Sequence, residues 1–276
     1  MVLRVTTPME EKHLRPIYIA IATFCILLSG CGGSSSTPAP TPTPTPVPQL
    51  AITSGNWDFA VASTSGTNFL IGGNVVQTGT SVTGGIRVAN SACFADGTAV
   101  PISGTINGQT ATVTSDSIAS QIINASLSGS ATALTGTYTV TGTGCAGGDK
   151  GNIAGVLVPS VSGTWKGTFI SNTVANPGVG VTAPIVEGAP DTTGLFVITG
   201  TSTYVGSPCF ASGTATTGSG MAGRTTDVRF TNDDGSTVEF IGSLNNPAAP
   251  TQITGTYTVT GGLCDGDSGT GQITKQ

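Results

Sequence analysis

The chain has 276 residues, a formal net charge of −5 and a charged fraction of only 8%. A weakly acidic chain of this kind lacks the basic surface that attracts nucleic acid, so we expect no nucleic-acid partner. His13 is the single histidine, and it lies near the N-terminus. The rest of the sequence therefore has neither histidine-based catalysis nor histidine metal ligands.

The first element is an apolar run of twelve residues, 17–28, which follows the basic residues Lys12 and Arg15. A membrane-spanning helix needs about 20 apolar residues, so the shorter run predicts a secretory signal over 1–30. The run ends in Leu28-Ser29-Gly30-Cys31, which resembles the lipobox of bacterial lipoproteins. This resemblance implies cleavage before Cys31, lipidation of its thiol and a membrane anchor through the lipid.

The residue after the cysteine is Gly32. An aspartate there would resemble the retention signal of inner-membrane lipoproteins, so the glycine favours the outer membrane of a bacterial cell envelope. Two alternatives for the leader are an ordinary cleaved signal with a chance cysteine and a membrane anchor helix. Translation could start at Met1 or at Met9, because residues 1–8 add nothing that a signal needs.

Residues 31–50 form the predicted tether, with proline at every second position from 38 to 48 and mainly threonine between the prolines. Alternating proline favours an extended, polyproline-like chain that rises about 3.1 Å per residue. We therefore expect a disordered spacer that holds the folded part of the protein away from the membrane.

The sequence beyond the tether contains an internal repeat. Three segments return in the same order, at offsets of 108, 116 and 119 residues: SGNW at 54–57 as SGTW at 162–165, SACFADGTA at 91–99 as SPCFASGTA at 207–215, and TGTYTVTG at 135–142 unchanged at 254–261. Matched segments in the same order indicate a duplication with a period long enough for a whole domain. We expect one domain over 51–158 and a second over 159–276.

Each copy is expected to consist of short strands. Polar and apolar residues alternate in LTGTYTVTG, 134–142, which predicts a strand with one buried and one solvated face. The pairs Asn107-Gly108 and Asp234-Gly235 lie between such runs and suit tight hairpin turns. The pattern gives roughly eight strands per copy and no sustained amphipathic helix. The predicted fold class is all-β, with two tandem antiparallel meander domains, each a barrel or a sandwich.

Four cysteines remain once Cys25 is assigned to the signal and Cys31 to the lipid. An even number of cysteines in an exported chain predicts disulfides. Each copy has one cysteine in its CFA segment and one after its TYTV strand, so the repeat pairs Cys93 with Cys145 and Cys209 with Cys264. A zinc site built from all four is the alternative, but no two of them have the short spacing of zinc ligands.

Each copy opens with a Gly-x-Trp motif, Gly55-Asn56-Trp57 and Gly163-Thr164-Trp165. The motif resembles the first strand of lipocalin-like and other calycin barrels, and the resemblance implies that Trp57 and Trp165 plug one end of a barrel. These families also place a basic residue near the last strand, over the tryptophan. Lys275 matches this position, whereas Lys150 precedes the last strand of its copy. The alternative is a core tryptophan on the first strand of any β domain.

Carboxylates are the remaining candidates for acid–base chemistry. The pairs we considered are Asp96 with Asp149 and Asp265 with Asp267. A calcium loop could use Asp265 and Asp267, but Gly269 stands where a further ligand would be needed. We expect no catalytic site, no metal and no cofactor.

These patterns together predict an exported, lipid-anchored envelope protein with two disulfide-stapled β domains. We expect a monomer with a non-enzymatic, structural or interaction role, whose partner is a protein or an extracellular matrix. The alternative is a protein that binds a small apolar ligand in a calycin-like barrel lumen, which would require a roomy apolar cavity.

Overall fold

The computed structural model describes residues 48–64, 66, 68–144, 146–173 and 178–276. The predicted signal, the lipidated Cys31 and most of the tether lie outside the described residues. Residues 46–276 form one compact unit. The described part of this unit consists of strands and turns, and it contains no helix that is long and apolar enough to cross a membrane.

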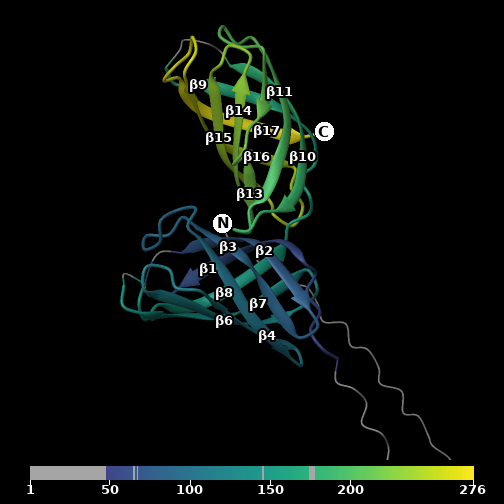
Figure 1. Ribbon diagram of the computed structural model, residues 1–276, viewed down its shortest axis with the longest axis vertical. Helices are drawn as coiled ribbons and strands as arrows, with labels where there is room; N and C mark the ends of the chain where they lie inside the picture. Colours follow the sequence, from purple (N-terminus) through teal and green to yellow (C-terminus); the bar gives the residue numbers. More distant parts are fainter. Residues whose placement is uncertain (1–47, 65, 67, 145, 174–177) are drawn as a thin grey trace, which may run out of the picture. The chain divides into compact units, whose positions relative to one another are not determined.

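The first copy is a closed antiparallel barrel of eight strands in sequence order, which we call barrel 1 (Figure 1). β1 pairs with β2 and closes the barrel by pairing with β8, so that Trp57 lies opposite both Gly73 and Leu157. The strands are β1 (Gly55–Ser63), β2 (Phe69–Thr78), β3 (Ser81–Ala89), β4 (Ala99–Asn107), β5 (Thr110–Ser115), β6 (Gln121–Gly129), β7 (Ala133–Gly142) and β8 (Lys150–Leu157).

The second copy is also a closed antiparallel barrel, barrel 2, in which β9 pairs with both β10 and β17. Its fourth strand is broken into two short pieces, β12 and β13, each of which pairs with β11 and β14. The strands are β9 (Gly163–Ser171), β10 (Val179–Pro190), β11 (Phe196–Val205), β12 (Ser212–Ala215), β13 (Gly220–Ala222), β14 (Thr225–Asn232), β15 (Thr237–Leu244), β16 (Gln252–Thr260) and β17 (Ser268–Lys275). The two tandem all-β domains are thus barrels, not sandwiches.

The alternation predicted for the TYTV segment is present in β7. Tyr138 and Val140 are buried, whereas Thr137 and Thr139 are exposed. The inward side chains of each barrel pack into a separate hydrophobic core. Period-two alternation therefore generates both barrels, because every strand gives one row of side chains to the lumen and one row to the surface.

The hairpins fall close to the predicted turns. Asn107 pairs with Thr110, which leaves Gly108 and Gln109 as the two-residue loop, one position later than the Asn-Gly pair suggests. Gly108 and Gly235 have φ values of 56° and 83°, in the left-handed region that glycine adopts without steric cost. These two glycines allow the tight reversals between neighbouring strands.

The segment before each first strand covers one end of its barrel. Leu50 and Ile52 are buried ahead of β1, and Val158 and Val161 are buried ahead of β9. The backbone N–H of Leu50 donates to the carbonyl oxygen of Gly108, at 2.8 Å. The residues that leave the tether are therefore part of the core of barrel 1.

Candidate functional site

The tryptophan of each Gly-x-Trp motif lies at one end of its barrel, which we call the Trp end. Trp57 and Trp165 are fully buried, and each indole N–H donates to the carbonyl oxygen four residues earlier, at 2.9 Å in both copies. Lys275 lies over Trp165, with Nζ 6.0 Å from the ring centroid, in the position that the calycin resemblance implies. Lys150 pairs with Thr139 at the far end of β8. Both a barrel plug and an ordinary core tryptophan fit this geometry.

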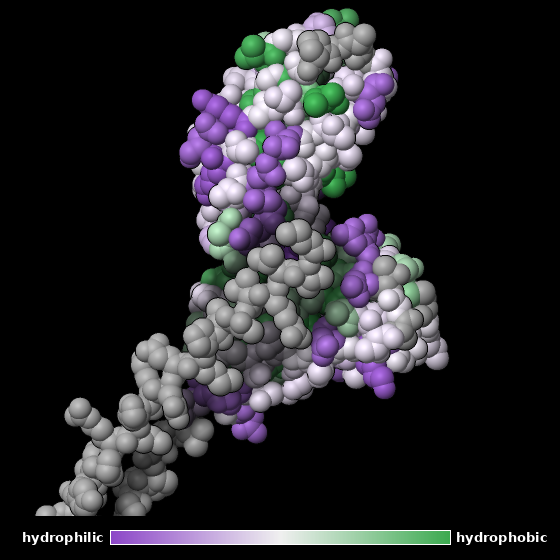
Figure 2. Space-filling view, turned by 180° about the vertical axis from the view of Figure 1, so that it is seen from behind, coloured by the Kyte–Doolittle hydropathy of each residue, from purple (hydrophilic) through white to green (hydrophobic). Residues whose placement is uncertain are grey.

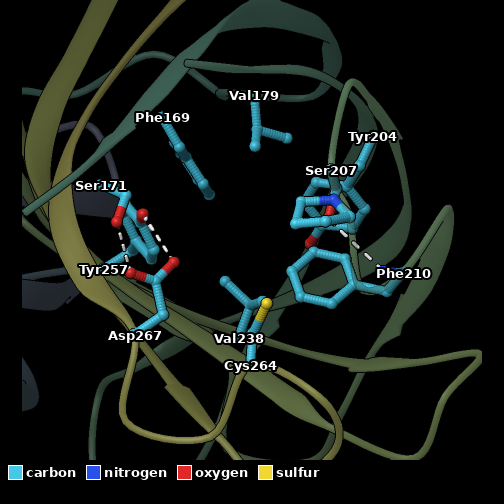
Figure 3. Close-up of a pocket in the computed structure, with 11 residues that line it drawn as sticks. Phe169, Ser171, Val179, Tyr204, Ser207, Phe210, Val238, Tyr257, Cys264 and Asp267 are labelled. Atoms are coloured by element: carbon cyan, nitrogen blue, oxygen red, sulfur yellow. Dashed lines mark hydrogen bonds between the residues drawn. The ribbon is translucent and has the colours of Figure 1, made fainter. Parts of the chain in front are cut away.

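The opposite end of barrel 2 carries a polar cluster beside a small cavity (Figure 3). Asp267, in the turn before β17, accepts hydrogen bonds from the hydroxyl groups of Tyr257 at 3.0 Å and Ser171 at 2.6 Å. Thr173 donates to the same carboxylate oxygen as Ser171. Figure 3 shows this cluster on one side of the cavity, with three residues of the opposite wall facing it: Tyr204, Ser207 and Phe210.

Barrel 1 repeats the cluster. Asp149 accepts hydrogen bonds from the hydroxyl groups of Tyr138 and Ser63, both at 2.7 Å. In each copy the tyrosine comes from the TGTYTVTG strand, the serine from the end of the first strand and the aspartate from the region before the last strand. Because the same three residue types meet in both barrels, the cluster is a shared element that ties the first, seventh and eighth strands together.

Burial and hydrogen bonding set the protonation states of this cluster. Burial raises the pKa of Tyr257 to about 12, and the hydrogen bond to Asp267 adds to that shift. Burial also acts to raise the pKa of Asp267, but hydrogen bonds from Ser171 and its two neighbours in the cluster outweigh it, so this pKa lies below its usual value. At neutral pH the tyrosine is thus a fixed donor and the carboxylate a fixed acceptor. Neither group is suited to proton transfer at this pH.

The predicted disulfide of the second copy is present. Cys209 and Cys264 are bonded, with Cα atoms 5.9 Å apart, and the bond joins the β11–β12 loop to the β16–β17 loop. The hydroxyl of Ser207 accepts hydrogen bonds from the backbone N–H groups of Cys209 and Phe210, at 3.2 and 3.4 Å. These contacts fix the loop over the end of barrel 2, which we call its disulfide end.

The first copy has the same loop chemistry. Ser91 accepts hydrogen bonds from the backbone N–H groups of Cys93 and Phe94, both at 3.1 Å. Phe94 is buried, and its ring lies 6.1 Å from that of Phe69 in an edge-to-face arrangement. Cys145, the expected partner of Cys93, lies outside the described residues, so the Cys93–Cys145 pairing stays a prediction.

The barrel interiors are filled by side chains. A cavity of about 50 Å³ lies inside barrel 1, beside Phe59 and Ile71. Barrel 2 contains a cavity of about 30 Å³ beside Phe169 and one of about 20 Å³ at its disulfide end. Since one water molecule occupies about 30 Å³ in the liquid, these spaces have room for very few water molecules.

Of the aspartate pairs that are candidates for acid–base chemistry, Asp96 and Asp149 lie in different loops, whereas Asp265 and Asp267 lie in the same loop between β16 and β17. The carboxylate of Asp96 accepts a hydrogen bond from the backbone N–H of Asn90, and that of Asp265 accepts one from Gly261, both at 2.7 Å. Their proposed partners, Asp149 and Asp267, accept the hydrogen bonds of the tyrosine hydroxyl groups. Among the residues that the structure describes, no group of three or more histidine, cysteine or acidic side chains is placed to hold a metal ion.

A second buried polar contact joins β1 of barrel 1 to the β13–β14 turn of barrel 2. The side chain of Asn56 accepts a hydrogen bond from the N–H of Gly223 at 2.7 Å and donates one to its carbonyl oxygen at 3.2 Å. Asp58, whose side chain is 2% exposed, accepts from the backbone N–H of Arg224 at 3.0 Å and from its guanidinium at 2.7 Å. The hydrogen bond to Asp58 raises the pKa of Arg224 further above its ordinary value.

Within the polar cluster, the serine is a residue that comparison of the two copies matches. Ser63 and Ser171 each lie six residues after the tryptophan of their copy, but serine and threonine are too common in this chain for that match to stand out. The residues that join the two barrels show no such match between the copies. Asp58 aligns with Lys166 in the second copy, so the repeat gives no reason to pair it with an arginine.

No protein-family model, curated protein or solved structure matches this chain. The lipobox and calycin resemblances therefore rest on the residues that carry them. The structural features from which a function can be inferred are the filled barrels, the hydrogen-bonded cluster that each barrel contains and the outer surface of the two barrels.

Proposed function

We propose that this chain is an exported bacterial lipoprotein, held in the cell envelope by a lipid on Cys31, whose two barrels have a non-enzymatic structural or interaction role. The non-enzymatic structural or interaction role is supported by the filled interior of both barrels. A protein whose lumens are occupied by its own side chains contacts other molecules through its outer surface.

The alternative, an apolar ligand in a lumen, is less well supported by the cavity volumes. Sites for small ligands typically measure about 300–1,000 Å³. The cavity inside barrel 1 measures about 50 Å³. A lipid or pigment would have to displace core side chains such as Phe59, and the buried contacts of an aromatic core side chain are worth about 3–5 kcal/mol.

The outer surface suits contact with neutral partners better than binding of charged ones. Most of the face in Figure 2 has intermediate hydropathy, with hydrophilic and hydrophobic side chains in separate small patches. The low charged fraction of 8% has the same consequence, because a sparse charge pattern gives little long-range electrostatic attraction. We propose a protein or a neutral matrix polymer as the partner.

The anchor is supported by the tether and by its junction with barrel 1. The side-chain amide of Gln109 donates a hydrogen bond to the carbonyl oxygen of Pro48, so the end of the tether is fixed to the β4–β5 turn. At about 3.1 Å per residue, residues 32–49 would reach on the order of 50 Å when extended. Such a spacer would hold barrel 1 clear of the membrane surface.

Metabolic labelling with a palmitate analogue tests the anchor. In a bacterial host we expect the label on the wild-type chain and its loss in Cys31→Ser, with the variant moving to the soluble fraction. Cys25→Ser is the matched control, because Cys25 lies in the predicted signal and should not carry lipid in the mature chain. A labelled, membrane-bound Cys31→Ser protein would refute the anchor.

Titration of residues 46–276 with an apolar fluorescent dye tests the filled lumens. We expect no saturable binding by the wild-type unit. Phe59→Ala is the positive control, because it enlarges an apolar cavity that is already present. Saturable, one-to-one binding by the wild-type unit would overturn the surface role and favour the ligand-binding alternative.

A further inference from the structure

Four steps along the chain place glycine directly after an asparagine or an aspartate, and they are Asn107-Gly108, Asp96-Gly97, Asp234-Gly235 and Asp265-Gly266. In such a step the backbone nitrogen of the glycine can attack the side-chain carbonyl carbon of the residue before it, because glycine has no side chain to hinder the approach. Asparagine reacts with loss of ammonia, and aspartate with loss of water. What the two reacting groups contact in the fold decides whether they can meet.

In the three Asp-Gly steps both reacting groups are hydrogen-bonded. The glycine N–H groups donate to backbone carbonyl oxygens at 2.9–3.0 Å, and these donors are Gly97, Gly235 and Gly266. The aspartate carboxylates accept from backbone N–H groups at 2.7–2.9 Å, and these acceptors are Asp96, Asp234 and Asp265. A nitrogen and a carboxylate held in this way have to give up their hydrogen bonds before they can react, so the fold protects these steps.

The Asn-Gly step has no such protection. Asn107 is the last residue of β4, and its side chain is exposed. Among the described residues, neither the side-chain amide of Asn107 nor the backbone N–H of Gly108 has a hydrogen-bond partner. Apart from its chain neighbours, no atom lies within 4 Å of where a Cβ on Gly108 would be. Both reacting groups are therefore free of partners and open to water.

The hairpin itself requires this glycine. Gly108 is the first residue of the two-residue β4–β5 loop and has a φ of 56°, whereas φ of Gln109 is negative. This is the pattern of a type II′ turn, which places glycine at the first central position. A residue with a side chain would be strained there, so the turn that joins β4 to β5 also creates the reactive step.

We propose that Asn107 is a site of spontaneous deamidation in the folded protein. The backbone nitrogen of Gly108 forms a bond to Cγ of Asn107, the Cγ–Nδ2 bond breaks, and the proton of the backbone N–H leaves with ammonia. Water then opens the resulting succinimide ring at either of its carbonyl groups. The products are aspartate and isoaspartate at position 107, with ammonia lost and water gained. Solvent water is the only co-reactant, and the proposal does not depend on lipid anchoring.

The β4–β5 turn is also where the tether meets barrel 1. The carbonyl oxygen of Gly108 accepts the hydrogen bond of the Leu50 N–H at 2.8 Å, and Gln109 holds the end of the tether. In isoaspartate the main chain runs through the former side chain and is longer by one carbon atom. Because Asn107 and Thr110 are the pair that closes the hairpin, the extra atom displaces the Gly108 carbonyl from Leu50. We expect the modification to loosen the residues that leave the tether.

The backbone pairing of Asn107 sets the pace of the reaction. Ring closure requires Asn107 to rotate out of the extended conformation in which it pairs with Thr110. The end of a hairpin opens locally at a much lower free-energy cost than the barrel as a whole. The reaction should therefore be slower in the native protein than in the denatured chain, but it should not require global unfolding.

Peptide mapping by mass spectrometry measures the reaction in residues 46–276 during incubation at mildly alkaline pH. In the native wild type we expect Asn107 to exchange its NH₂ for OH, and its peptide to split into aspartate and isoaspartate forms, before any Asp-Gly step changes. Asn107→Gln should abolish this product, because its longer side chain closes a six-membered ring far more slowly. Asn152→Gln is the matched control: Asn152 is also exposed on a strand but precedes isoleucine, so its loss should leave the reaction at Asn107 unchanged.

Hydrogen exchange at the backbone N–H of Leu50 measures the effect on the tether. Loss of its hydrogen bond should raise the exchange rate about 3–10-fold in the incubated wild type and leave incubated Asn107→Gln unchanged. Thermal unfolding establishes that each variant is folded. The proposal is overturned if the native protein keeps the amide of Asn107 over the time in which the denatured chain loses it, or if an Asp-Gly step reacts first. Unchanged exchange at Leu50 after conversion would overturn the loosening of the tether.

Discussion

Removal of one hydroxyl from the polar cluster of barrel 2 is a quantitative probe of its structure. In Tyr257→Phe the carboxylate of Asp267 loses a donor at 3.0 Å. The ring should stay in place, because it stacks on Phe169 with centroids 4.9 Å apart. Hydrogen bonds to charged groups contribute about 1.5–3 kcal/mol. Asp267 is only half-buried and can regain some hydration, so we expect a loss of about 1–1.5 kcal/mol at neutral pH.

The effect should depend on pH with a defined sign. The pKa of Asp267 is lowered in the folded state, so its contribution to stability is present above the unfolded-state pKa and is lost as the pH falls through the folded-state pKa. Tyr257→Phe removes one cause of that lowering. The difference in stability between variant and wild type should therefore shrink as the protein is acidified below about pH 4, where the carboxylate becomes protonated in the unfolded chain.

Urea unfolding followed by tryptophan fluorescence measures this difference barrel by barrel, since each barrel has one tryptophan. With Trp57 replaced by Phe in both proteins compared, Trp165 reports barrel 2 alone. The matched variant Tyr138→Phe, in the Trp165→Phe background, makes the same change in barrel 1. A loss below about 0.3 kcal/mol at neutral pH, or one that persists unchanged in acid, would refute the role given to the hydrogen bond.

Three further outcomes follow from the structure. Arg224→Met leaves the carboxylate of Asp58 buried without its cation and should lower the free energy of unfolding in urea by about 2 kcal/mol. This loss is smaller than the roughly 3–5 kcal/mol of a fully buried pair because Arg224 is 28% exposed. Asp58→Asn in the same chain should recover most of the loss. Burial raises the pKa of Tyr204 to about 12, above the unfolded value of 10.0, so stability should fall as the pH rises from 10 to 12, and Tyr204→Phe should reduce that fall in alkaline melting curves. Replacement of Cys209 and Cys264 by alanine opens a loop with a sequence separation of 55 and should cost about 4 kcal/mol in the same unfolding assay.

Much of the fold was predictable because it depends on short-range sequence patterns. Alternation identified strands such as β7 and β16, and the repeat identified two domains of one architecture. The choice between barrel and sandwich depended on whether β1 pairs with β8, a contact that no local pattern encodes. The break between β12 and β13 was also unpredictable, because Gly218, with φ of 92°, is one of many glycines in the chain.

The polar sites were predictable only in part. The sequence offered Asp149 and Asp267 as carboxylate candidates, but it gave no sign that each accepts a hydrogen bond from a tyrosine on a neighbouring strand. The joint between the barrels depends on Asp58 and Arg224, which differ between the copies and are far apart in sequence. Comparison of the copies identifies the residues that both share, whereas this contact depends on residues that differ between them.

The buried segment ahead of each first strand has a consequence for how this protein arose and how it can be cut. The first strand of barrel 1 begins at Gly55, yet the chain is already part of its core at Leu50; Val158 has the same position in barrel 2. The duplicated gene fragment must have included the codons for this segment, since a copy that began at the strand would have left its Trp end open. A barrel excised as a fusion cassette should therefore begin before Pro48 or before Val158.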